Sequence, residues 1–505
     1  MPKRASAKTG PEFILDHRAP GSLYRQLYER VRAAILQGQL EPGARLPSSR
    51  ALASELGVAR NTVALAYELL LLEGYIEGRV GSGTRVASLR RDRVNLTPDP
   101  RRIARPAALG RRSRILASAA TLNSLRVDRT SDEASVFRVG EPDISEFPYA
   151  TWANLLARHA RHSLPVAARY QDPQGYGPLR EAIAAHIGVT RGVRCAKEQI
   201  ILTAGAQGAL DLIARVLLDP GDHVWAEDPG YAGAHGALLA AGARITPVPV
   251  DREGLEVAAG RALAPAARLA VVTPSHQFPT GVTMSLSRRL ALLEWAEEAG
   301  VWIVEDDYDS EFRYSGRPLE ALQGLDRAGR VLYVGTFSKA LFPALRLGYL
   351  VAPSELLDGL LATRRFIDTH PPLLEQLALA DFLTQGHYAR HLRRMRHLYR
   401  ERRDALVEAL NHDLGHLLEI AVPEAGLHLA AWLRPEAHPH ALAALESVTS
   451  PQTLRAASSN PAAPPRVGLL FGFACAAPDD LRTGVRSLAA ALPPPLSRRQ
   501  REAGD

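Results

Sequence analysis

The sequence predicts two folded units, a small α+β unit at residues 18–88 and a large α/β unit at residues 133–495. Three observations support this division. A chain of 505 residues is too long for one ordinary domain. Amphipathic helices and two short strands fill the first unit, whereas long helices alternate with short apolar strands in the second. Between them, residues 89–132 are rich in Arg, Pro and Ala and are typical of a linker, and we expect tails at residues 1–17 and 496–505.

The composition excludes several classes of protein. The two cysteines, Cys195 and Cys475, lie far apart, which rules out a disulfide framework or a zinc ribbon and fits the reducing cytoplasm. Residues 1–16 lack the pattern of a signal peptide, and no stretch approaches the ~20 apolar residues of a membrane span. We therefore expect a cytoplasmic protein without a metal site or a membrane partner.

The small unit has the pattern of a helix-turn-helix. An amphipathic helix is predicted at residues 23–37, a second begins at the caps Ser48 and Ser49, and a third covers about residues 60–73 after a break at Gly57. Two short strands, from Tyr75 and Thr84, form a hairpin. The second helix of a helix-turn-helix pair enters the major groove by its N-terminal residues, which here are Arg60, Asn61 and Thr62. The pattern alone leaves open a three-helix bundle with another ligand.

Positive charge is concentrated near the N-terminus. Residues 90–114 hold nine arginines and two acidic residues, in a chain whose net charge is +7. This distribution favours a first unit that faces phosphates, although a basic tail with no specific partner remains an alternative. The linker arginines either contact DNA beside the site or keep the linker soluble.

The large unit contains buried strands of the parallel kind. Apolar runs at residues 200–203, 223–226, 269–272, 301–304 and 331–334 predict an α/β domain whose ligands lie at the carboxyl ends of the strands.

Lysine is rare in this chain. Only Lys3, Lys8, Lys197 and Lys339 occur among 61 basic residues. A guanidinium cannot replace an amine that must lose its proton and act as a nucleophile, so a lysine in the middle of such a chain indicates chemistry. Lys339 follows the buried strand 331–334, whereas Lys197 has the context of a surface residue.

The other strand ends supply the groups that bind pyridoxal 5'-phosphate (PLP). A turn of small residues follows strand 200–203 and opens a helix, whose N–H groups can hold a phosphate. Tyr231 offers an aromatic ring for stacking, and acidic residues follow strand 301–304. Thr336, Ser338 and Arg346 surround Lys339 in the sequence. Each signal alone is weak, but together they comprise the amine, carboxylate, ring and phosphate ligands that PLP requires.

The small unit resembles the winged helix of the GntR family of bacterial regulators. The resemblance covers "LEPGARLPSSRALASELGVARNTVALAYELLLLEGYIEGRVGSGTRV". It implies binding to double-stranded DNA by Arg50, by the start of the recognition helix (Arg60, Asn61, Thr62), and by Gly81 and Ser82 of the wing.

The large unit resembles the aminotransferase-like domain of MocR-type GntR regulators. This resemblance is carried by "EDDYDSEFRY", "PSHQFPTG" and "GTFSKALFPALRLGYLV". With the small unit included, the resemblance to MocR-type regulators covers roughly residues 18–492. It implies the α/β PLP-dependent transferase fold type I, with a mostly parallel seven-stranded sheet and flanking helices, and a homodimer with swapped small domains.

The same resemblance implies roles for individual residues. Lys339 would form the Schiff base, Asp306 would pair with the pyridine nitrogen, and Tyr308 would bond the phenolic oxygen. The residues implied around the ring and phosphate are Tyr231, Ala206, Gln207, Thr336, Ser338 and Arg346. Some family members bind an effector through an arginine two residues after the Tyr231 position, where this chain has Gly233. We expect His276, Gln277 and Arg466 on the effector side, and His428 as a structural strand residue.

Three functions fit the sequence. The first is a PLP-dependent transcriptional regulator that senses PLP itself, or an amine or amino-acid effector, through Lys339. The second is a working aminotransferase with an accessory DNA-binding domain, because fold and cofactor do not establish turnover. The third is a DNA-binding protein that has lost its ligand, against which the intact set of Lys339, Asp306 and Arg346 argues.

Overall fold

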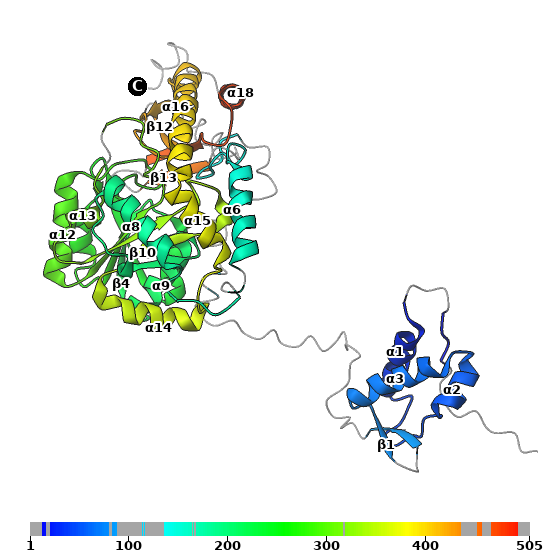
Figure 1. Cartoon of the computed structure of the whole chain (residues 1–505). Helices are drawn as coiled ribbons and strands as arrows, with labels where there is room; N and C mark the ends of the chain where they lie inside the picture. The colour runs from blue at the N-terminus through cyan, green and yellow to red at the C-terminus, as the bar shows by residue number, and fades with distance from the viewer. Residues whose placement is uncertain are drawn as a thin grey trace, which may run out of the picture. The chain divides into compact units, whose positions relative to one another are not determined.

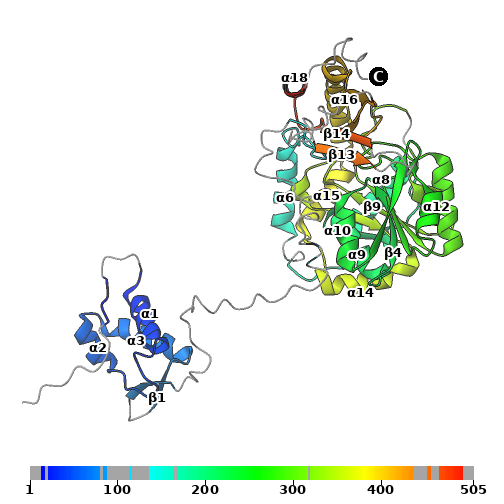
Figure 2. The same ribbon diagram turned by 180° about the vertical axis from the view of Figure 1, so that it is seen from behind.

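The computed structural model contains two compact units, residues Met1–Ala108 and Leu109–Asp505. It describes residues 13–16, 21–79, 83–87, 114, 116, 136–163, 165, 168–316, 319–435, 452–456 and 466–492. Figures 1 and 2 show both units from opposite sides. No helix in these ranges is both long enough and apolar enough to cross a membrane.

The first unit is a three-helix bundle with a β-hairpin. Its elements are α1 (Leu23–Leu36), α2 (Ser49–Leu56), α3 (Arg60–Leu72), β1 (Ile76–Arg79) and β2 (Gly83–Val86). Ser48 caps α2 by accepting a hydrogen bond from the N–H of Ala51 at 3.2 Å. Gly57 ends α2 in the left-handed conformation (φ 65°), which lets the chain turn directly into α3. Leu27, Val63 and Leu70 are fully buried between the helices.

The second unit is built on a twisted eight-stranded sheet. Its strands are β3 (Ile200–Thr203), β4 (His223–Asp228), β5 (Arg244–Asp251), β6 (Gly254–Leu255), β7 (Leu269–Val272), β8 (Trp302–Asp307), β9 (Val331–Thr336) and β10 (Gly348–Val351). Their spatial order is β3-β10-β9-β8-β7-β4-β5-β6. The five central strands β9, β8, β7, β4 and β5 are parallel, whereas β10 and β6 run antiparallel to their neighbours.

Helices cover both faces of this sheet. The first face packs against α9 (Gly205–Leu217), α10 (Ala232–Ala241) and α14 (Leu357–Ile367). The second packs against α11 (Val257–Leu263), α12 (Leu286–Ala299) and α13 (Leu322–Leu325), and nearer β3 against α8 (Gly177–Arg191) and α15 (Leu374–Thr384). Since successive residues of a strand point to opposite faces, each central strand contributes side chains to the hydrophobic cores on both faces of the sheet.

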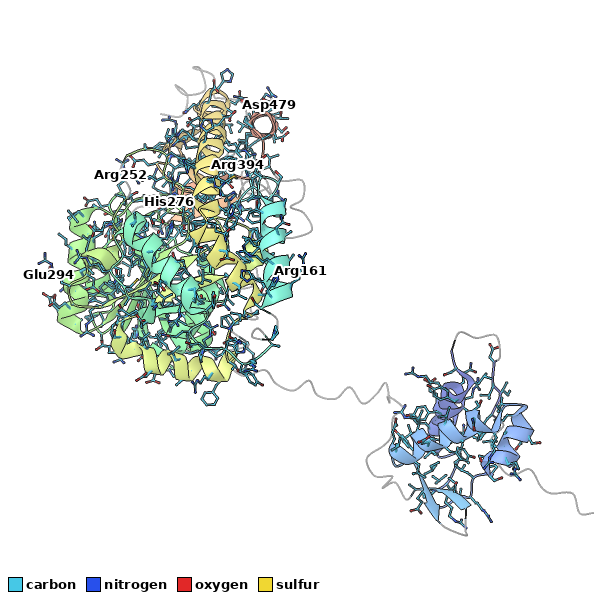
Figure 3. The ribbon with its side chains drawn as sticks, viewed as in Figure 1. Arg161, Arg252, His276, Glu294, Arg394 and Asp479 are labelled. Atoms are coloured by element: carbon cyan, nitrogen blue, oxygen red, sulfur yellow. The ribbon has the colours of Figure 1, made fainter. Side chains whose placement is uncertain are left out.

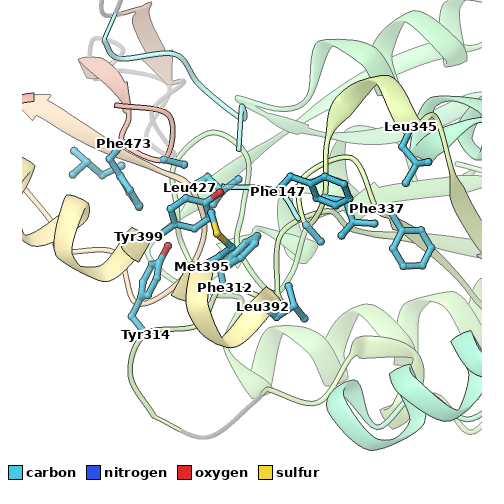
Figure 4. Close-up of a cluster of buried hydrophobic side chains, with 14 of the residues drawn as sticks. Phe147, Phe312, Tyr314, Phe337, Leu345, Leu392, Met395, Tyr399, Leu427 and Phe473 are labelled. Atoms are coloured by element: carbon cyan, nitrogen blue, oxygen red, sulfur yellow. The ribbon is translucent and has the colours of Figure 1, made fainter. Parts of the chain in front are cut away.

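The C-terminal part is a smaller layer of sheet and helix. α16 (His387–Leu414) and α18 (Pro478–Ala491) pack on an antiparallel sheet of order β11-β12-β14-β13. Its strands are β11 (Leu418–Ile420), β12 (His428–Leu433), β13 (Gln452–Ala456) and β14 (Arg466–Gly472). Aromatic and aliphatic side chains, among them Phe312, Tyr399 and Phe473, join this layer to the main sheet (Figure 4). α6 (Tyr149–His162) packs against α15.

The predicted elements agree with this fold, with two differences. The α/β class and the five predicted strands are confirmed, and the two-residue β6 extends the expected seven strands to eight. The prediction that strand 200–203 is of the parallel kind is wrong, because its one neighbour, β10, runs antiparallel to it. A strand buried on both faces is apolar whatever the direction of its neighbour. Single-turn 3-10 helices complete the unit at Lys197–Gln199, Pro343–Leu345 and Ser354–Leu356.

Candidate functional site

Three consecutive acids end β8, and strand alternation divides them between two faces. Glu305 accepts hydrogen bonds from the backbone N–H groups of Leu322 and Gln323 at 2.8 and 2.9 Å. Asp307, on the same face, pairs with Arg191 of α8 at 2.8 Å. These two carboxylates hold helices to the sheet. Asp306 lies between them and points to the opposite face.

Asp306 is a buried carboxylate without a partner for one of its oxygens. The side chain is 4% exposed, and no described group donates a hydrogen bond to Oδ1. Burial, together with the nearby carboxylates Asp307 and Glu227, raises its pKa to about 7, while Lys339 opposes the shift. A buried, unpaired carboxylate is costly to the fold, so this arrangement indicates a binding site for a cationic N–H group.

Lys339 approaches the same space from the turn that follows β9. Its Nζ donates a hydrogen bond to the carbonyl oxygen of Gly140 at 2.6 Å. Burial lowers its pKa, against the opposing attraction of Asp309 and Glu141. A desolvated amine with a lowered pKa is a better nucleophile at neutral pH.

His276, Tyr308 and Asp309 form a chain of polar contacts beside Lys339. The Nδ1 of His276 lies 3.0 Å from the hydroxyl of Tyr308 and 3.1 Å from Oδ2 of Asp309. His276 is buried inside the large unit (Figure 3). Burial, and next the charge of Asp309, raises the pKa of Tyr308 well above its usual value, so the phenol stays protonated and can donate a hydrogen bond.

His428 stands next to this chain, with its ring 4.9 Å from that of His276. Its Nε2 lies 3.2 Å from the carbonyl oxygen of Pro279, and burial lowers its pKa to about 3. His428 therefore presents a neutral imidazole in a buried strand, with no described hydrogen-bond partner for its Nδ1, and its structural role stays a prediction. Ligand atoms of His276, Asp309 and His428 lie within 4.8 Å of one another. However, the Nδ1 of His276 is already engaged by the carboxylate and the phenol, which favours a hydrogen-bonded chain over a metal centre.

A second group of residues surrounds the N-terminus of α9. Arg346 donates from Nη2 to the carbonyl oxygen of Ala204 at 2.9 Å, and its guanidinium lies against Gly205, where a Cβ would come within 3.0 Å of Nη2. Arg346 has a left-handed backbone (φ 50°), a conformation rare for residues with a side chain and often found at functional sites. The hydroxyls of Thr336 and Ser338 are 3.2 Å apart, and Ala206 and Gln207 lie in the first turn of the helix. Free N–H groups, hydroxyls and a guanidinium together form an anion site.

Tyr231 and Phe278 border the space between these two groups. Their rings meet edge to face with centroids 5.9 Å apart, and Tyr231 is 39% exposed. Because its phenol is influenced by both Asp306 and Arg346, Tyr231 lies near the carboxylate and the anion site at once.

The amide of Gln277 is hydrogen-bonded to other groups of the protein. Its amide nitrogen donates to Glu227, to Pro229 and to the carbonyl of Phe278, and its oxygen accepts from Thr280 at 2.6 and 3.0 Å. Arg466 is likewise engaged, since it pairs with Glu419 at 3.0 Å and its guanidinium lies over the ring of Trp432. Gln277 and Arg466 are thus engaged by other groups of the protein, and His276 lies beside Tyr308; the effector-side roles of all three stay predictions.

The first unit presents the residues predicted to contact DNA. Arg50, Arg60 and Asn61 are exposed, and Thr62 is partly exposed at the start of α3. The hydroxyl of Tyr67 donates to the carbonyl of Pro47 at 3.0 Å, which ties the loop before α2 to the recognition helix. Gly81 and Ser82 lie outside the described residues, between β1 and β2.

Sequence reasoning missed several residues around Lys339. Gly140, Glu141 and Asp309 approach its amine, and Phe278 contacts the rings of Tyr231, Tyr308 and His428. Asp309 stands in the quoted EDDYDSEF segment, so its position three residues after Asp306 was a usable signal. No signal in the sequence indicated the contact with Gly140, because 199 residues separate it from Lys339.

Comparisons with known proteins agree with both units. Residues 138–453 match the family model of aminotransferase class I and II, and residues 23–86 match that of bacterial regulatory proteins of the gntR family. The probable rhizopine catabolism regulatory protein MocR of Rhizobium meliloti is 43% identical over 484 residues, which cover 95% of this chain and 96% of that protein. The chain belongs to the MocR type of GntR regulators.

Other relatives of this MocR-type regulator are consistent with that assignment. The pyridoxine biosynthesis transcriptional regulator PdxR of Corynebacterium glutamicum is 34% identical, over 79% of this chain and 81% of that protein. LysN, an alpha-aminoadipate aminotransferase of Thermus thermophilus, has a TM-score of 0.65 and 30% identity, over 76% of this chain and 97% of LysN. The protein is therefore a helix-turn-helix transcriptional regulator with an aminotransferase-like domain of fold type I, a family that typically depends on PLP.

Proposed function

We propose that this regulator holds PLP at Lys339 and responds to an amine or amino-acid effector, or to PLP itself, by changing its affinity for DNA. The observation that carries the proposal is the buried, unpaired Oδ1 of Asp306 near Lys339. The pyridine nitrogen of PLP is the kind of N–H donor that would satisfy this oxygen.

The remaining residues fit the other parts of PLP. The amine of Lys339 is desolvated, and PLP supplies an aldehyde that bonds covalently to such an amine. Tyr308 is a protonated phenol that would donate to the phenolic oxygen, and Tyr231 would stack on the ring. The anion site at α9, with Ala206, Gln207, Thr336, Ser338 and Arg346, would hold the phosphate.

Sensing would depend on the release of Lys339. PLP, when bound, would supply an aldehyde carbon to which either Nζ of Lys339 or an effector amine could bond. On exchange, Nζ of Lys339 would take up the proton given up by the incoming amine and would be released from the cofactor. The freed side chain and its contact with Gly140 then differ between the two states, which gives the effector a means of shifting an equilibrium.

The DNA-binding part of the proposal assigns contacts to Arg50, Arg60, Asn61 and Thr62, and to Gly81 and Ser82 in the wing. We further propose a cytoplasmic homodimer with exchanged winged helices, which would bind repeated half-sites. Light scattering of the purified protein tests the dimer. A monomer at micromolar concentration would refute that part.

An active aminotransferase is the second candidate, because transamination needs the same amine, carboxylate and anion site that support PLP binding. Steady-state assays with a panel of amino and keto acids, run beside DNA-binding assays, separate the two. We expect specific DNA binding and slow turnover. Rapid turnover without specific DNA binding would reverse this choice.

A further inference from the structure

One side of the Lys339 site is an apolar wall. Ala430, Leu454 and Leu470, from three adjacent strands of the C-terminal sheet, form a small buried cluster. Val139, Phe278 and Trp432 pack against it. Val139 precedes Gly140, which accepts the hydrogen bond from Lys339, and the ring of Phe278 lies 6.0 Å from that of Tyr308. The wall therefore adjoins the Lys339 site through Val139 and Phe278.

The described arginines near the wall are engaged by other groups. Arg138, beside Val139, is paired with Glu141 at 3.4 Å, and Arg466, at the start of β14, is paired with Glu419. Arg466 also lines a hollow of about 720 Å³ together with Ala430 and Trp432 of the wall, and its guanidinium lies over the Trp432 ring; neither Lys339 nor Asp306 borders this hollow. Arg346 faces the opposite end of the site, at the N-terminus of α9.

The backbone near Tyr231 also excludes a cationic side chain. A Cβ added at Gly233 would lie 2.4 Å from the ring of Tyr231, so a larger residue there requires that ring to move. With Tyr231 in its present position, only glycine fits at position 233.

The charges that do surround Lys339 are negative. Asp309, Glu141 and Asp306 all attract its ammonium form, and Arg346 is the one cation that opposes it among the charges that act most strongly on Lys339. A carboxylate on an effector would meet this negative field and would lose its hydration against apolar side chains without gaining a partner.

Building on the proposed function, we propose that the effector is an amine without a carboxylate, whose uncharged or apolar remainder packs against the wall of Val139, Phe278, Ala430 and Leu470. Amino acids are then the weaker ligands, since the same nitrogen is accompanied by a charge that the wall does not accommodate.

Matched pairs of ligands test this selectivity on the full-length protein loaded with PLP. Phenethylamine is compared with phenylalanine, and 3-methylbutylamine with leucine. The change of the cofactor's absorbance band gives the affinity, and fluorescence anisotropy of the upstream DNA gives the regulatory effect. We expect each amine to bind at least tenfold more tightly than its carboxylated counterpart. An amino acid that binds as tightly as its amine overturns the inference.

Substitutions in the wall make the test two-sided. Val139→Arg places a cation at a partly exposed position and should raise the relative affinity for phenylalanine tenfold or more, whereas the control Val139→Leu should not. Leu470→Arg is the second variant, and an unchanged preference in both folded variants overturns the inference. Arg466→Ala should leave the preference of the wild type unchanged, and loss of amino-acid binding in it would show that Arg466 is the clamp.

Failure of the underlying function gives a different result. A protein that takes up no PLP contradicts the proposed function itself. A PLP-loaded protein whose spectrum responds to neither member of any pair overturns the amine effector and leaves PLP as the sensed molecule.

Discussion

Replacing Asp306 with Asn should stabilise the cofactor-free protein at alkaline pH, although the same change removes the partner of the pyridine nitrogen. The structure gives Asp306 a pKa of about 7, against an ordinary value of 3.8. An acid with a raised pKa in the folded state contributes stability that is fully present below its unfolded pKa and is lost as the pH rises through the folded pKa. Asp306 therefore lowers the free energy of unfolding progressively as the pH rises from about 4 to about 7.

The magnitude follows from the size of this shift. Each unit of pKa difference corresponds to about 1.4 kcal/mol, so the full cost above pH 7 is on the order of 4 kcal/mol as an upper bound. Between pH 6 and pH 8, the wild type should lose about 1.4 kcal/mol through Asp306 alone. Asn has the same shape and does not titrate, so Asp306→Asn should not show this loss.

Denaturant unfolding of the cofactor-free protein at pH 6 and pH 8, followed by circular dichroism, measures the effect. The matched control is Asp307→Asn, which leaves Arg191 without its partner in a buried ion pair and should destabilise the protein by about 3 kcal/mol. Glu227, Glu305 and Glu311 also have raised pKa values near 7 and are present in both proteins, so Glu305 and Glu311 largely cancel in the comparison, whereas Glu227 interacts with Asp306 and cancels only in part. Parallel pH profiles for the wild type and Asp306→Asn would refute the assignment of Asp306 as a strained, unpaired acid.

Further predictions concern the phosphate ligands, the DNA contacts and the core of the small unit. Arg346→Ala should weaken PLP binding by roughly 10- to 100-fold while pyridoxal, which lacks the phosphate, binds almost unchanged in equilibrium titrations. An equal loss for both would place Arg346 elsewhere. Arg60→Ala should weaken binding to the operator by about 1–3 kcal/mol in anisotropy assays, and Arg25→Ala, on an exposed part of α1, should not. Leu70→Ala removes a fully buried side chain and should destabilise the small unit by about 2–5 kcal/mol, which differential scanning calorimetry can resolve as a shifted transition. An unchanged transition would contradict the packing of α3.

Much of the fold could be predicted because its signals are local. The five buried strands are apolar runs of four residues, and Ser48 and Gly57 mark the ends of α2 by capping chemistry that acts within a few residues. β10 was not predicted, because no helix separates its short apolar run from the Lys339 turn. Neighbouring parallel strands are normally joined by such a helix, so the pattern did not indicate another strand of the sheet. β13 was missed because it lies in an irregular, proline-rich stretch.

Some residues of the candidate site could likewise be predicted from local signals, and others could not. Asp306 lies at the end of β8, Lys339 follows β9 closely and Arg346 lies just before β10, so the order of strands brings them together. The roles of Gln277 and Arg466 could not be predicted, because they depend on side-chain partners far away in the chain, such as Glu227 and Glu419. The two faces of β8 explain why three adjacent acids have different tasks, and alternation alone could have separated Asp306 from Glu305 and Asp307.

Whether Lys339 couples PLP to DNA binding is tested most directly by the binding of upstream DNA to the wild type and to Lys339→Ala, each titrated with PLP and then with an amine. The wild type should gain an absorbance band with PLP and should change its DNA affinity when the amine is added. Lys339→Ala should lack that band, and its DNA affinity should no longer respond to the amine. A wild type that binds DNA equally well in every state, or a Lys339→Ala variant that responds as the wild type does, would contradict this coupling.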